Sequence, residues 1–133
     1  MLDRAQAACV VVAPDFSIFP DFPPVFARYQ IWRSRLIAAY WQQNGVNVIP
    51  CLQWTHPNDP DLLSYFSGLS KCRVVAVRSP SRGYEKDWIR CAEIFQASFS
   101  GVVLHFGPKR GSEVWKSRLI LPLNPSSGSN RNG

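Results

Sequence analysis

The chain has 133 residues, of which 46% are hydrophobic and 18% charged, and this composition fits one globular domain and excludes a largely disordered chain. Its apolar runs are much shorter than the roughly 20 residues that a membrane helix needs, so we expect no membrane partner. The formal net charge of +6 lies in the second half, where residues 71–133 carry eleven Lys and Arg against four Asp and Glu. This surplus favours a polyanionic partner such as nucleic acid.

Five short apolar runs predict strands at 8–13, 46–54, 72–77, 101–106 and 118–123. Helices are expected between them, at 24–43, 59–68 and 84–99, with a short one at 111–117. This alternation predicts an α/β fold, namely an open, mostly parallel sheet of about five strands in a single three-layer domain, or a fragment of a barrel-like sheet. We expect the domain to cover residues 1–125 and the Gly-, Ser- and Asn-rich tail 126–133 to be disordered.

The predicted helix at 24–43 carries a large apolar stripe, formed by Val25, Tyr29, Trp32, Leu36 and Tyr40. We favour this stripe as the buried face, with Arg28 and Arg35 facing solvent. The alternative is that the exposed rings and guanidinium groups stack on bases. Arg33 falls between the two faces, and we expect it to pair with Asp15 or Asp21.

Polar residues follow each of the first four predicted strands. Loops at the carboxyl ends of parallel strands meet at one edge of a sheet, where ligands bind in such folds. The sequence therefore predicts a crevice at this edge, lined by Asp15, Ser17, Asp21, Arg33 and Trp54. Prolines at 14, 20, 23 and 24 would stiffen the first loop and hold Asp15 and Ser17 in place. The alternative is that the two aspartates cap turns or helices.

Two of the loops, RSPSRG and GPKRGS, combine Gly and Ser with cations. Such loops can surround a phosphate with backbone N–H groups and positive charge, although neither has the spacing of a nucleotide-binding P-loop. The candidate phosphate ligands are Arg78, Arg82, Lys109 and Arg110.

Candidate catalytic groups are Asp15, His56 and His105, where either histidine would act as a general base if Asp15 oriented it. The alternative for His105 is a hydrogen-bonded histidine in the core. The sequence shows no serine-nucleophile elbow, and it offers few clustered carboxylates for two-metal hydrolysis. The four cysteines have no metal-binding spacing, so we expect buried, reduced thiols, no metal site, no cofactor and a cytoplasmic location.

The segments PDFSIFPDFP and IWRSRLIAAYWQQNGVNVIPCLQW resemble an uncharacterised domain family of phages, plasmids and other mobile elements. The resemblance spans about residues 12–107 and includes a P-D-F-S motif with a following D-x-P, then R-x-R, Y-x-Q, N-G and V-I-P with a Trp. It places the family pattern on Asp15, Phe16, Ser17, Asp21, Arg33, Arg35, Tyr40, Asn44, Gly45, Pro50 and Trp54. The resemblance implies a mobile-element protein and no particular activity.

Together these features favour an accessory protein of a mobile element that binds nucleic acid, or a host or phage nucleoprotein complex, through a basic strand-end face. The first alternative is an inhibitor that binds a host defence or replication complex. The second is a phosphoester or nucleotide hydrolase at the crevice. The sequence does not determine the oligomeric state.

Overall fold

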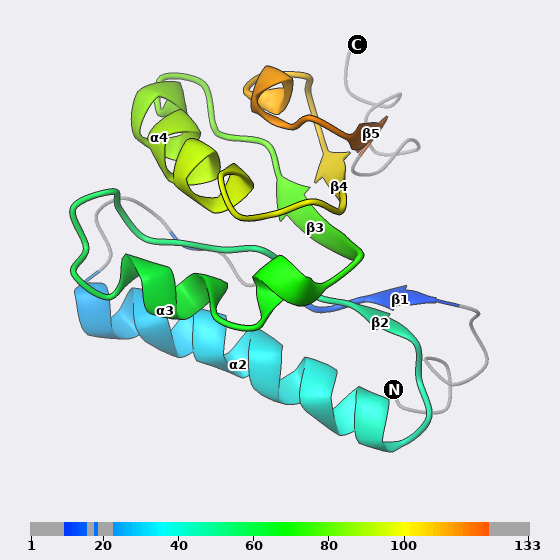
Figure 1. The fold of residues 1–133 in the computed structure, drawn as a ribbon. Helices are drawn as coiled ribbons and strands as arrows, with labels where there is room; N and C mark the ends of the chain where they lie inside the picture. The colour runs from blue at the N-terminus through cyan, green and yellow to red at the C-terminus, as the bar shows by residue number, and fades with distance from the viewer. Residues whose placement is uncertain (1–9, 16–17, 19–22, 123–133) are drawn as a thin grey trace, which may run out of the picture.

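The computed structural model describes residues 10–15, 18 and 23–122, and strands alternate with helices along them (Figure 1). The elements are β1 (Val11–Val12), α2 (Pro24–Gln43), β2 (Val48–Ile49), α3 (Leu62–Phe66), β3 (Val74–Arg78), α4 (Glu85–Gln96), β4 (Val102–Phe106) and β5 (Arg118–Leu121). The predicted α/β class is confirmed. A 3-10 turn at Ser112–Val114 replaces the short helix predicted at 111–117. None of the helices in the described part is long and apolar enough to cross a membrane.

All pairings between the described strands are parallel, but the strands form two sheets rather than a continuous one. The first sheet has the order β1-β2 and the second has the order β3-β4-β5. They are joined by one isolated parallel bridge between Cys51 and Ala76, where the Ala76 N–H donates to the Pro50 carbonyl oxygen. Pro50 has no N–H to donate, which explains why the pairing between β2 and β3 does not extend.

The main core lies between β3 and β4 and the helices α3 and α4. Val75 and Val103 are completely buried, and they belong to one cluster with Phe66 of α3 and Phe95 of α4. All three described helices contribute to this cluster, α2 through Ile31. A second helical layer on the opposite face of β3 and β4, as a three-layer domain would have, is not seen in the described residues.

Helix α2 has the predicted bounds, but the face that we predicted to be buried is the exposed one. Its buried side chains are small ones together with Ile31 and Trp41, and Ser34 Oγ donates to the Pro14 carbonyl oxygen at 2.6 Å. Small residues let part of the helix lie close to the segment after β1, while Trp41 belongs to one cluster with Val11 of β1. The large apolar stripe that we predicted as the core face is about half exposed and faces away from the sheet. The prediction of its burial is wrong.

The arginines predicted to face solvent from α2 bind polar groups instead. Arg28 Nε donates to the Tyr65 hydroxyl at 2.9 Å, and Arg35 Nη2 donates to the Tyr65 carbonyl oxygen. Helix α2 ends as predicted at Asn44, and Gly45 follows with φ +83°, a conformation that glycine adopts without strain. The predicted domain boundary at 125 and the tail 126–133 lie outside the described residues.

Candidate functional site

The loops that follow β1, β2 and β3 converge on one cleft of about 870 Å³. Its lining includes Asp15, the segment 52–56, the segment 77–81 and the first residues of α2 and α4. This location is the carboxyl-terminal edge of the parallel strands, and the volume lies within the roughly 300–1,000 Å³ of typical ligand sites.

An ion pair between Asp15 and Arg78 spans the edge of this cleft. The Asp15 carboxylate accepts a bond from Arg78 Nε, and it accepts a second one from Gln53 Nε2 at 3.0 Å. These three residues follow or end β1, β2 and β3, so the pair connects loops from three strands. The same pair borders a smaller hollow of about 220 Å³ on its other side, lined mainly by apolar side chains such as Val12 and Phe106.

Arg78 keeps donors available despite this ion pair. Its side chain is 54% exposed and contacts Asp15 through Nε, so the two terminal amino groups have no partner among the described residues. The carboxylate therefore fixes the plane of the guanidinium group and leaves its outer edge open. That edge matches the spacing of two oxygens of a phosphate.

Aromatic rings form the floor and the mouth of the cleft. Trp54 is 9% exposed and contacts Trp88 edge to face, with the ring centroids 5.2 Å apart. Tyr84, which caps the start of α4, also lines the cleft and is 56% exposed. A ring that remains exposed at the mouth of a cleft can stack on a planar ligand.

Asp59 holds another part of the cleft lining in place. Burial opposes the charge on this carboxylate, but hydrogen bonds from Thr55, the Asp61 N–H, Tyr65 and Arg28 outweigh it and lower the pKa to about 2. Asp59 is therefore ionised at neutral pH and links the loop after β2 to α2 and α3.

The two histidines have different environments. His56 lies in the cleft, where its Nε2 is 3.1 Å from Asp87 Oδ2 and its Nδ1 accepts a bond from the Asn58 N–H. His105 is fully buried beside Trp115, whose Nε1 donates to His105 Nδ1 at 3.1 Å, and burial lowers the His105 pKa. His105 lies in the core, as the alternative interpretation had it, and does not line the cleft.

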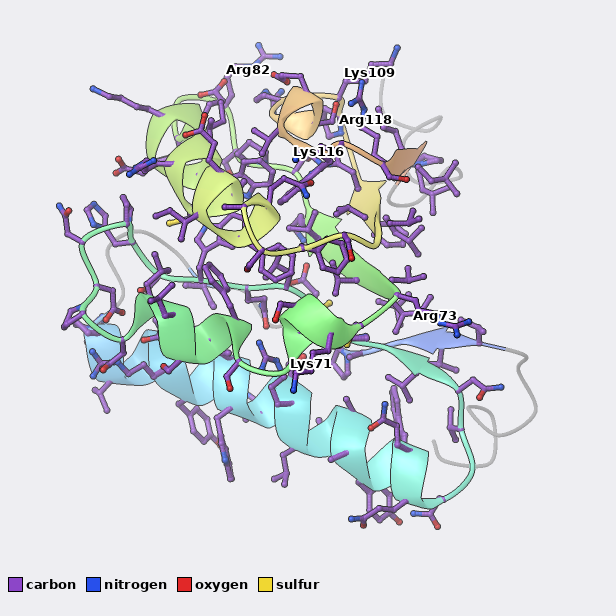
Figure 2. All side chains as sticks on the ribbon, viewed as in Figure 1. Lys71, Arg73, Arg82, Lys109, Lys116 and Arg118 are labelled. Carbon is purple, nitrogen blue, oxygen red and sulfur yellow. The ribbon has the colours of Figure 1, made fainter. Side chains whose placement is uncertain are left out.

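The four candidate phosphate ligands are not equivalent. Arg110 donates to the Pro80 carbonyl oxygen and lies 3.6 Å from Glu85, and it does not line the cleft. Arg82 and Lys109 are exposed and have no acidic partner among the described residues. Figure 2 shows them far from Lys71 and Arg73, so the described cations spread over the molecule rather than forming one basic face.

The remaining predicted residues lie elsewhere. Arg33 donates to Gln30 Oε1 at 2.8 Å and stacks over the ring of Tyr29, while Asp15 pairs with Arg78. Ser17 and Asp21 lie outside the described residues. Sequence reasoning did not name Gln53 or Tyr84 as crevice residues, although Gln53 adjoins Trp54 and Tyr84 ends the loop RSPSRGY that it placed at this edge.

Comparison with known proteins agrees with the resemblance noted in the sequence. Two proteins named "Gene 1 protein" are similar to the chain: that of Mycobacterium phage D29 is 34% identical over 99 residues, and that of Mycobacterium phage L5 is 34% identical over 79 residues. These alignments cover 74% and 59% of the chain, but only 33% and 34% of the relatives. The chain thus spans about a third of the length of these relatives. No solved structure matches it.

A family model described as Domain of unknown function (DUF4417) matches residues 1–110. The match confirms the predicted membership of an uncharacterised family with phage members. The chain therefore belongs to the DUF4417 family.

Proposed function

We propose that the chain is a mobile-element accessory protein that binds single-stranded nucleic acid in the strand-end cleft. The guanidinium group of Arg78, held by Asp15, would bind a backbone phosphate, and Tyr84 at the mouth would stack on a base. The observation that carries the proposal is the arrangement of Arg78: a cation fixed at the edge of a nucleotide-sized cleft with its outer donors open, in a cleft that an exposed ring also lines.

The charge of the cleft favours a single strand over a duplex. Arg78 is paired with Asp15, Arg28 with Asp59 and His56 with Asp87, which leaves Lys86 as the lining cation without an acidic partner among the described residues. Such a lining is close to neutral, and it provides one or two phosphate contacts rather than a long cationic track. A duplex also keeps its bases stacked inside, whereas a single strand can present a base to Tyr84.

The supporting features extend to the rest of the molecule. The net charge of +6 would draw a polyanion toward the chain at low salt. The thiols of Cys51, Cys72 and Cys91 are free, which fits a reducing compartment such as the cytoplasm.

A binding titration tests the proposal. The anisotropy of a fluorescent single-stranded oligonucleotide should rise on addition of the chain, and the logarithm of the affinity should fall with the logarithm of salt by roughly 0.7 per neutralised phosphate. Arg78→Ala should weaken binding roughly tenfold, because it removes a charge-assisted contact.

The matched control is Arg73→Ala. Arg73 is exposed and adjoins the other end of β3, so this variant removes the same charge far from the cleft. Equal losses for the two variants would indicate only nonspecific attraction and would reject the cleft as the site. Binding that does not depend on salt would reject phosphate recognition altogether.

A further inference from the structure

The outward face of α2 carries an apolar stripe whose side chains remain at least 45% exposed. Six of the ten large hydrophobic side chains that are exposed in the described residues lie on it. This outer stripe consists of Val25, Phe26, Tyr29, Trp32, Leu36 and Tyr40, with exposed fractions from 45% to 72%. The first three rings along the helix stack on one another, with centroids 6.5 Å and 6.1 Å apart.

The outer stripe is large for a surface that stays in water. A Phe, Tyr or Trp side chain buries about 150–250 Å² when covered, so four half-exposed rings leave roughly 400 Å². That area reaches the range of the largest apolar patch on a typical monomer, and patches of this size mark interaction sites. With Val25 and Leu36 counted beside the four rings, two copies of the stripe would bury roughly 1,000 Å² in total, the lower limit for a specific interface.

The order of residues in the stripe is nearly symmetric about its middle. The midpoint falls between Trp32 and Arg33; Tyr29 and Leu36 lie about one helical turn from it in opposite directions, and Val25 and Tyr40 lie about two turns from it. When two such helices run antiparallel about this midpoint, Val25 faces Tyr40, Tyr29 faces Leu36, and Trp32 faces Arg33 beside the axis. Each of the two outer pairs then joins an aliphatic side chain to a ring.

A two-fold interface brings the same surface of two copies together, so each such contact is made twice. We propose that α2 pairs antiparallel with α2 of a second copy of this chain, across a two-fold axis between Trp32 and Arg33.

The charges of α2 fit this partner better than an acidic foreign helix. Helix α2 has three arginines and no acidic residue, but Arg28 and Arg35 are turned inward and bound to groups of α3 and its preceding loop. Only Arg33 adjoins the stripe, where it lies 5.4 Å from the centroid of the Tyr29 ring. In the antiparallel pair Arg33 comes next to Trp32 of the other copy, and a guanidinium over an indole face is attractive.

Sedimentation velocity over a concentration series tests the proposal. The 15.0 kDa chain should sediment as a monomer when dilute and approach twice that mass as the concentration rises through about the micromolar range. Leu36→Glu should raise the dissociation constant by roughly 30-fold or more, because it buries a charge against Tyr29 of the other copy, one turn from the centre of the interface.

The control is Leu63→Glu, which places the same charge at a 70% exposed leucine of α3 that does not belong to the stripe. This variant should dimerise like the wild type, and circular dichroism should show that both variants are folded. A wild-type chain that stays monomeric at the highest concentration would overturn the proposal. A dimer that survives Leu36→Glu, or one that Leu63→Glu weakens equally, would overturn it too. Because these residues lie outside the cleft, the outcome is independent of nucleic-acid binding.

Discussion

Asp59 connects the cleft to the stability of the fold. Its side chain is 6% exposed and accepts hydrogen bonds from four groups, including the Tyr65 hydroxyl at 2.8 Å and the Asp61 N–H at 2.9 Å. A carboxylate buried in this way is stable only as long as its donors remain in place. The loop after β2, which forms one wall of the cleft, therefore depends on this residue.

The lowered pKa predicts a change of stability with pH. The pKa of Asp59 falls from 3.8 to about 2 on folding, so its contribution to the free energy of unfolding is complete above about pH 4 and is lost as the pH falls through about 2. Asp59→Asn should lower the free energy of unfolding at pH 7 by about 2 kcal/mol and flatten the decline between pH 4 and 2. Urea unfolding across this pH range measures both effects.

Asp61→Asn is the control for this prediction, because Asp61 also binds Arg28 but is 53% exposed. An exposed ion pair contributes little, so this variant should lose less than about 1 kcal/mol. If the two variants showed the same pH profile, the assigned role of Asp59 would be wrong.

Helix α2 shows how far periodicity alone can predict structure. Its length, its start after Pro23 and its end before Gly45 all follow from the sequence. Two stripes with the same helical period run along it, however, and the more hydrophobic one lies outside. The choice depends on what the helix packs against: small side chains such as Ser34 let part of the helix lie close to the segment after β1, and Ile31 and Trp41 fill core clusters. This packing is a property of the assembled fold and not of the helix sequence.

Two adjacent alanines test this orientation. Ala38 is 7% exposed and packs against the strands, whereas Ala39 is exposed. Ala38→Leu should lower the free energy of unfolding by about 1–3 kcal/mol through overpacking. Ala39→Leu should change it by less than about 0.5 kcal/mol. Urea denaturation of both variants measures the difference, and a larger loss for Ala39→Leu would mean that the outer stripe is the buried face.

For the whole molecule, the sequence predicted the positions of the strands along the chain better than the extent of the sheet. Continuous apolar runs correctly located the five strands of the described residues. The break between β2 and β3 comes from Pro50, which sequence reasoning had placed inside a strand without counting its missing N–H.

The topology of the whole sheet explains which site residues could be predicted. Asp15 and Arg78 are 63 positions apart, and they meet because carboxyl ends of parallel strands share an edge. The shared edge of parallel strands does not predict which cations remain without an acidic partner. Arg110 is held by Glu85 at the start of α4, and Arg82 and Lys109 remain exposed, a distinction that only the three-dimensional arrangement makes.

The most direct test of the cleft as a nucleic-acid site is photocrosslinking. A single-stranded oligonucleotide carrying a photoreactive thymine analogue would be irradiated with the chain, and the crosslinked residues identified by proteolysis and mass spectrometry. We predict crosslinks within residues 79–90, at Tyr84 or Trp88, which line the cleft beside Arg78. Crosslinks confined to the outer stripe of α2, or to the cations at 116–118, would contradict this account.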